Sequence, residues 1–134
     1  MANYNCVIRT NYFHVKDENT FEEFLKKVSG DDFHVFREGD MFGFGCYGSI
    51  YGISESDEDD EDDYDAFLEG LQKQIVDDEA IIISEAGYEK LRYVSGYATV
   101  ITSQNISAVN LDDKAIELAQ EMLKNKQYQP KMDY

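Results

Sequence analysis

Hydrophobic and polar positions in the first third of the chain follow the period of a helix. From Phe21 to Val28, apolar residues recur at positions i, i+3, i+4 and i+7, which is the spacing of one helix face. Thr20 and Glu23 have the T-x-x-E spacing of a capping box at the start of this segment. The segment Ser29–Asp31 is rich in residues that end helices. The pattern therefore predicts one amphipathic helix here.

Two more helices and several strands are expected further along the chain. Helical spacing runs from Tyr64 to Ile75, and a third helix capped by Asn110 or Asp112 extends to about Leu123. Segments rich in β-branched and aromatic residues are typical of strands. The predicted strands are 5–15, 33–37, 41–53, 80–83, 91–103 and 106–109.

The order of these elements predicts an α+β fold. Turns are expected at Glu38–Asp40 and Glu85–Gly87, which gives the order β-αββ-αββ-β-α. Such a chain forms an antiparallel sheet of five to six strands with two or three helices on one face. The other face would be solvated or covered by a partner. We expect residues 1–124 to form a single domain, with an acidic loop over 54–63 between the two αββ units and a C-terminal tail over 125–134.

The two αββ units resemble each other in sequence. Phe21–Leu25 aligns with Tyr64–Leu68 at an offset of 43, and Cys46–Ile50 aligns with Gly96–Val100 at an offset of 50. Two amphipathic helices resemble each other easily by chance. The second match, in the corresponding strand, favours an internal duplication.

The chain is strongly acidic, with 28 acidic and 12 basic residues and a net charge of −16. Nine of the acids lie between Glu55 and Asp65, and the net charge without them would still be −7. Nucleic-acid affinity comes largely from basic side chains that neutralise phosphates. We therefore expect no direct binding to nucleic acid or to anionic membranes. The charge either keeps the protein in solution or steers it towards a basic or nucleic-acid-binding protein.

The sequence contains no recognisable catalytic motif. Gly43, Gly45 and Gly48 have the spacing of a dinucleotide-binding loop, but the chain continues there as a strand where that loop needs a helix. Glu85, Glu89 and Arg92 lie around a predicted hairpin, where a solvated turn is favoured over a functional site. The sequence predicts no catalytic residue and no cofactor, and it favours a non-enzymatic protein.

The candidate metal ligands do not form a recognisable site. His14, His34, Cys6 and Cys46 lie in separate segments and lack the spacing of a zinc site. The acidic run, Glu55–Asp65, does not match a calcium-binding loop, because Asp62 lies where that loop requires glycine. No metal is predicted.

The candidate partner-binding residues are the acidic run and three tyrosines in strands that are rich in glycine and small residues. Tyrosine in a sheet belongs either to a core or to an interface, and the three tyrosines are compatible with both interpretations. The residues predicted to contact a partner are Glu55, Asp57, Glu58, Asp59, Asp60, Glu61, Asp62, Asp63, Tyr47, Tyr93 and Tyr97.

The expected location is the cytoplasm. The N-terminus has neither the basic nor the apolar region of a signal peptide. No stretch approaches the roughly 18 apolar residues of a membrane span.

Three segments, Arg9–Phe13, Phe42–Ile50 and Glu85–Val94, resemble an uncharacterised family of small acidic proteins. Members of that family are carried by phages, plasmids and conjugative elements of Gram-positive gut bacteria. The resemblance covers most of residues 5–123 and implies no site residues. It implies a mobile-element setting, in which small acidic proteins inhibit host defence, some of them by mimicking DNA.

Three functional hypotheses follow. The first is a non-enzymatic binding module whose acidic surface occupies the nucleic-acid site of a host protein. The alternative is a small ligand-binding domain or enzyme with an aromatic-lined pocket between sheet and helices. A third is a dimerisation module that uses the open sheet face; the sequence leaves the oligomeric state undetermined, with a dimer possible.

Overall fold

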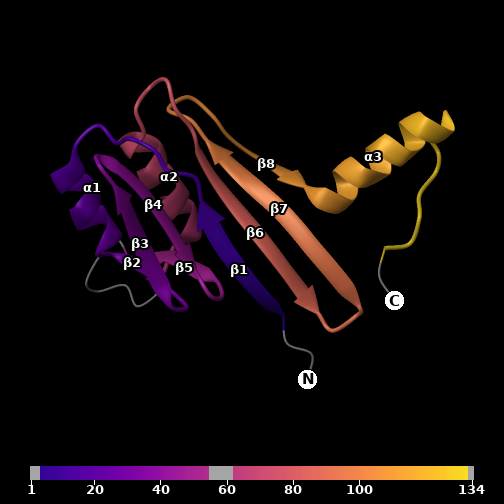
Figure 1. The fold of residues 1–134 in the computed structure, drawn as a ribbon, viewed down its shortest axis with the longest axis horizontal. Helices are drawn as coiled ribbons and strands as arrows, with labels where there is room; N and C mark the ends of the chain where they lie inside the picture. Colours follow the sequence, from indigo (N-terminus) through magenta and orange to yellow (C-terminus); the bar gives the residue numbers. More distant parts are fainter. Residues whose placement is uncertain (1–3, 55–61, 133–134) are drawn as a thin grey trace.

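The structure is a computed structural model, and it describes residues 4–54 and 62–132 (Figure 1). It contains a six-stranded antiparallel sheet, a separate two-stranded sheet and three helices, so the predicted α+β class is confirmed. The elements in chain order are β1 (Asn5–Thr10), α1 (Glu18–Leu25), β2 (Val28–Gly30), β3 (Phe33–Glu38), β4 (Met41–Cys46), β5 (Ile50–Ile53), α2 (Tyr64–Gln74), β6 (Ile81–Glu89), β7 (Tyr93–Ile101), β8 (Ile106–Asn110) and α3 (Leu111–Leu123).

The main sheet has the strand order β3-β4-β1-β6-β7-β8. Strand β1 lies in the middle, between the hairpin β3-β4 and the hairpin β6-β7 (Figure 1). The register joins Ile8 to Cys46 on one side and to Glu85 on the other. Because side chains alternate across a strand, this register fixes which residues share a face.

The core is a layer of aromatic rings between one face of the sheet and helices α1 and α2. Phe21 of α1 packs edge-on against Phe13 and Phe42, with ring centroids 5.7 and 4.9 Å apart. Phe24 of α1 stacks on Phe67 of α2 at 6.2 Å and joins the two helices. All of these rings except Phe24 are at most 1% exposed. Offset and edge-to-face packing of this kind adds to the free energy that burial alone provides.

Each helix begins at a side chain that accepts backbone N–H groups. Asp17 caps α1 and accepts from Asn19 N at 3.2 Å, so the expected capping box at Thr20 is wrong. The hydroxyl of Thr20 instead donates to Asp17 at 2.6 Å. A carboxylate satisfies the free N–H groups of the first turn and also opposes the helix dipole, which explains why the helix begins earlier.

The segment 41–53, expected to be one strand, breaks into β4 and β5. Residues 47–49 turn the chain out of the main sheet, and β5 pairs with the short strand β2. Strand β2 was not predicted, because Val28 continues the helical spacing although α1 ends at Leu25.

The predicted turn Glu85–Gly87 is also wrong. These residues lie inside β6, where Glu85 pairs with Ile8 and Tyr97. The chain reverses after Glu89, and Lys90 takes the left-handed conformation with φ of 49°. Side chains alternate between the two faces of the sheet along β6, so a strand can carry a polar residue at every second position. The strand therefore does not need to end at Ser84.

The two αββ units lie on opposite sides of β1, each as a helix followed by an antiparallel hairpin. The helix alignment agrees with the structure, since Phe24 of α1 and Phe67 of α2 stack on each other. The strand alignment does not match in position, because Cys46 ends β4 whereas Gly96 lies inside β7. The duplication stays an interpretation that rests on the helices.

Helix α3 does not pack on the sheet with the other two helices. It begins directly after Asn110, the last residue of β8, and points away from the rest of the molecule (Figure 1). Asn110 caps it and accepts from Asp112 N at 2.9 Å and Asp113 N at 3.2 Å. No residue of α3 is buried.

Candidate interaction surfaces

The two faces of the main sheet differ sharply in charge. We call the face covered by α1 and α2 the helix side, and the opposite one the open face. Alternation along the paired strands places these residues on the open face: Asn5, Val7, Arg9, His34, Phe36, Glu38, Met41, Gly43, Gly45, Ile82, Ser84, Ala86, Tyr88, Val94, Gly96, Ala98, Val100, Ser107 and Val109. Glu38, on the edge strand β3, is the one carboxylate in this set. In a chain with 28 acidic residues, such a face is suited to contact with protein.

An apolar groove of about 850 Å³ lies on the open face over β1, β6 and β7. Its open-face lining includes Val7, which pairs with Ala86, and Tyr88, which pairs with Val94. Its apolar sides include Leu91 and Val94, which are 87% and 64% exposed. Exposed apolar residues that are contiguous, rather than scattered, mark an interaction site.

The acids of the described chain gather on the other side of the molecule. Helices α1 and α2 and the connector that follows α2 carry most of them, with four lysines among them over 16–27 and 62–79. The acids in these two segments are Asp17, Glu18, Glu22, Glu23, Asp62, Asp63, Asp65, Glu69, Asp77, Asp78 and Glu79. The helix side is therefore an acidic surface whose charges project from helix ends, helix faces and one connector.

The predicted acidic partner residues fall into two groups. Glu55, Asp57, Glu58, Asp59, Asp60 and Glu61 lie outside the described residues. Asp62 is exposed, whereas Asp63 has a structural role. Its side chain caps α2 by accepting from Ala66 N at 3.1 Å, and its backbone pairs with Ile53. Both the side chain and the backbone of Asp63 thus make contacts within the fold.

Two of the three predicted tyrosines lie together, on the part of the helix side next to the β6–β7 turn. Tyr97 is hydrogen-bonded to Glu85, and burial is the main reason that the pKa of Tyr97 is raised. Tyr4 donates to the same carboxylate at 2.9 Å and stacks on Tyr93 at 6.1 Å between centroids. The carboxylate of Glu85 is thus hydrogen-bonded to two tyrosine hydroxyls. This arrangement was not predicted, because Glu85 was expected in a solvated turn.

The third tyrosine, Tyr47, lies apart from this cluster. It belongs to the turn between β4 and β5, is 72% exposed and packs edge-on against His34 at 6.0 Å. Of the three, Tyr47 is the one whose ring is largely available to a partner.

The two cysteines do not provide a reactive thiolate. Burial raises the pKa of Cys46 to about 11, and the Sγ atom donates to the Gly48 carbonyl oxygen at 3.2 Å. Burial also raises the pKa of Cys6. Because the thiolate is the nucleophile, both groups are poorly suited to nucleophilic chemistry at neutral pH.

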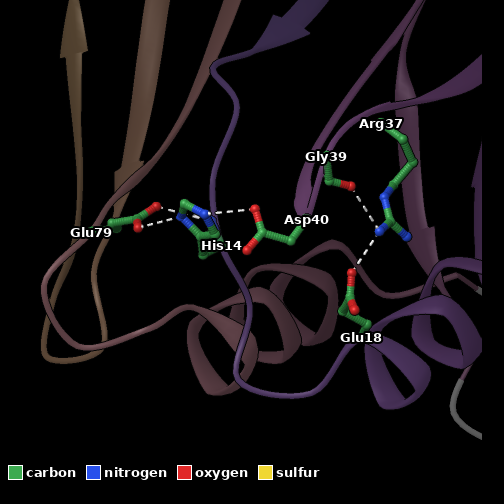
Figure 2. A network of polar contacts seen from close by, with 6 residues as sticks. All are labelled: His14, Glu18, Arg37, Gly39, Asp40 and Glu79. Atoms are coloured by element: carbon green, nitrogen blue, oxygen red, sulfur yellow. Dashed lines mark hydrogen bonds and ion pairs between the residues drawn. The ribbon is translucent and has the colours of Figure 1, made fainter.

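The histidine His14 is the centre of a network of polar contacts that Figure 2 shows. One ring nitrogen, Nδ1, lies 2.6 Å from Glu79, and the other, Nε2, lies 3.1 Å from Asp40. The hydrogen bond to Glu79 is the main cause that raises the pKa of His14. Both ring nitrogens are engaged, so the imidazole ring joins the connector after β1 to the β3–β4 turn and to the connector after α2. This geometry describes a clamp rather than a free general base.

The alternative hypothesis places an aromatic-lined pocket between sheet and helices. The phenylalanine rings of that layer contact one another. A groove of about 350 Å³ lies at its outer edge, between α1 and β3. Arg37, which lines this groove, is held by ion pairs to Glu18 and Glu22.

Among residues 4–54 and 62–132, no group of three or more His, Cys, Asp or Glu side chains is placed to hold a metal ion. Within the same ranges, no helix has the length and apolar character needed to cross a bilayer.

Comparison of the chain with protein-family models, with curated proteins and with solved structures gave no match. The mobile-element setting implied by the sequence resemblance therefore stays a prediction.

Proposed function

We propose that this chain is a non-enzymatic, acidic protein-binding module whose helix side occupies a basic, nucleic-acid-binding surface of another protein. The observation that carries the proposal is the segregation of charge. Carboxylates project from α1, α2 and the connector after α2, whereas the open face has a single carboxylate at its edge. A random distribution that served only to keep the chain in solution would place acids on both faces.

The electrostatics of such a surface favour a basic partner. Opposite potentials steer two proteins together and raise the association rate, and the effect falls as salt screens the charges. A protein groove that binds nucleic acid is lined with lysine and arginine, so it presents the complementary charge. The acidic side of the chain would stand in for the phosphates in that groove. In the setting that the resemblance implies, the result would be inhibition of a host nucleic-acid-binding or defence protein.

The test is capture of partners from a bacterial lysate on the immobilised chain, followed by competition with duplex DNA. We expect basic proteins to be retained at about 0.05 M NaCl and released by about 0.5 M, because screening over a Debye length near 3–10 Å removes the attraction. Duplex DNA should displace the same proteins. Retention that does not depend on salt, or that DNA does not compete with, would contradict the proposal.

Matched charge variants localise the binding surface. Asp65→Asn, Glu69→Gln and Asp78→Asn neutralise three exposed acids of the helix side. The control neutralises three exposed acids of α3, through Asp113→Asn, Glu117→Gln and Glu121→Gln. The net charge changes equally, so we expect roughly tenfold weaker binding from the first set and little change from the second. Equal effects would mean that net charge alone drives the association.

The predicted acidic run needs a separate variant. Replacing the acids of 55–61 with Asn and Gln tests whether these residues contribute to the same association. If binding is unchanged while the helix-side variant loses it, the partner contacts the helices and not the run.

A further inference from the structure

We propose that the chain forms a two-fold symmetric homodimer in which α3 of each subunit lies in the open-face groove of the other. This inference does not depend on the acidic helix side and goes beyond the function proposed above. It rests on the apolar stripe of α3, on the junction at Asn110 and on the charge of the open face.

Helix α3 carries an apolar stripe that stays largely exposed in the described part of the chain. Leu111, Ala115, Leu118 and Met122 recur at intervals of four, three and four residues, which places them on one side of the helix. Leu118 is 56% exposed and Met122 is 75% exposed. The opposite side carries Asp113, Glu117 and other polar groups. An amphipathic helix gains most of its stability in a protein from packing that apolar side against another surface.

The junction between β8 and α3 directs the helix away from the groove of its own subunit. Asn110 pairs with Tyr97 as the last residue of β8 and also caps α3, with no linking residue between the two elements. Folding α3 back over β6 and β7 would break this pairing and the cap together. The helix therefore extends away from the sheet, as Figure 1 shows, and its stripe is presented to another molecule.

The groove and the stripe form one continuous apolar surface. Leu111, the first residue of α3, lies against Gly96 on the open face of β7, and a Cβ atom at Gly96 would be 3.2 Å from its side chain. The groove adjoins this contact, with Val94 two residues along the same strand. Continuity of this kind allows a two-fold axis near Leu111 to place each helix on the neighbouring groove. Such an interface is isologous, because each subunit contributes the same helix and the same groove.

The distribution of charge favours contact between two copies of the chain through the open face over contact through their other surfaces. Two molecules of net charge −16 repel each other, and the helix side brings acids against acids. The open-face residues of β1, β4, β6, β7 and β8 include no carboxylate among the described strands. Two copies can meet there without burying an unpaired negative charge, which would be costly.

The first test is the mass of the full chain in solution. Analytical ultracentrifugation should give a dimer of the 15.4 kDa chain. The dimer should tighten when NaCl rises from about 0.05 to about 0.5 M, because salt screens the repulsion and leaves the apolar contact. A basic partner responds to salt in the opposite direction, so failure of either proposal can be recognised separately. A monomer at about 0.1 mM protein in both buffers overturns the dimer, since a stable apolar interface persists at that concentration.

Matched variants then test the stripe. Leu118→Lys with Met122→Lys adds two positive charges on the apolar side of α3, and Glu117→Gln with Glu121→Gln changes the net charge equally on the polar side. We expect the first pair to weaken the dimer by roughly tenfold or more and the second pair to leave it at least as tight. Circular dichroism checks that both pairs remain folded; the four side chains are exposed. A dimer that survives the lysine pair overturns the proposal.

A mixing experiment tests the exchange of helices. Val94→Lys alters the groove and should also give a monomer. A mixture of this variant with the Leu118→Lys and Met122→Lys variant retains one unaltered helix-in-groove contact, whereas neither variant alone retains any. We expect mixed dimers to form at concentrations where each variant alone is monomeric. Absence of mixed dimers overturns the reciprocal arrangement, even if the wild-type chain is a dimer.

Discussion

At the scale of single residues, His14 is held between two carboxylates from different connectors. Its ring joins Glu79 and Asp40, which lie far from it in sequence. A proton on the ring allows both contacts to be charged hydrogen bonds, and the pKa of His14 is raised as a result, chiefly by Glu79. A group whose pKa is raised on folding stabilises the folded state in its protonated form.

The stability of the protein should therefore depend on pH through His14. The stabilising contribution is complete below the unfolded value near 6.5 and is lost as pH rises through the higher pKa of the folded state. We expect the urea midpoint to fall as the pH rises above the unfolded value of 6.5, and His14→Gln to flatten this part of the profile. Glu79→Gln should lower the pKa of His14 in an NMR titration. A profile of the same slope in His14→Gln would assign the dependence to another group.

Two glycines with positive φ provide a matched test of local packing. Gly52 has φ of 127°, and a Cβ atom there would lie 2.4 Å from the backbone of Asp63. Gly39, in the β3–β4 turn, has φ of 61° and open space around it. Gly52→Ala should therefore cost at least about 2 kcal/mol, from backbone strain and from the clash. Gly39→Ala should cost about 1 kcal/mol, from the left-handed conformation alone. Urea unfolding of both variants measures the difference, and equal costs would contradict the close packing at Gly52.

At the scale of elements, the start of α2 depends on one residue of the acidic run. Asp63 accepts from Ala66 N and pairs through its backbone with Ile53. The neighbouring Asp62 is exposed. The two acids thus differ in role although their sequence surroundings are nearly the same.

Alanine substitutions at these neighbours should separate the two roles. Asp63→Ala should lower the free energy of unfolding by about 1 kcal/mol, because a helix N-cap is lost. Asp62→Ala should change it by less than about 0.5 kcal/mol. Thermal or urea unfolding distinguishes these values, and equal effects would mean that both acids act only through charge.

The sequence predicted elements well where one period ran unbroken. The helical spacing of 64–75 agrees with α2, and the third helix begins at Asn110 as one of the two expected caps. It failed where tertiary contacts decided the outcome. Val28 continues a helical pattern but pairs with Ile53 in β2, and residues 47–49 turn the chain out of the sheet.

The candidate surfaces could be predicted only in part. The alternation of side chains along β6 indicates which of them lie on the open face. This pattern was missed because Glu85–Gly87 were assigned to a turn. The contact of Tyr97 with Glu85 depends on the register between β6 and β7, and sequence alone does not give that register. The groove needs three strands in register, and two of them lie far from β1 in the chain.

At the scale of the whole molecule, the chain has one charged side and one nearly neutral face. The acidic helix side is proposed to bind a basic partner, and the open face is proposed to bind a second copy. These two interactions use different surfaces, so a dimer would present two acidic sides at once. Two linked sites raise the effective affinity for a partner that is itself dimeric or repetitive.

The central position of β1 has a consequence for how the chain folds. Strand β1 is made before both of its neighbours, and its residues pair with Cys46 in β4 and, across a much longer loop, with Tyr88 in β6. During synthesis the first hairpin can pair with β1 while the second half is still absent, which leaves one edge of β1 open. Closing so long a loop slows folding, and sheets rich in non-local pairs fold on the order of milliseconds to seconds. Until β6 arrives, the half-formed sheet presents an unprotected edge to other nascent chains, so the interval before residue 89 is made is when this protein is most exposed to misassembly.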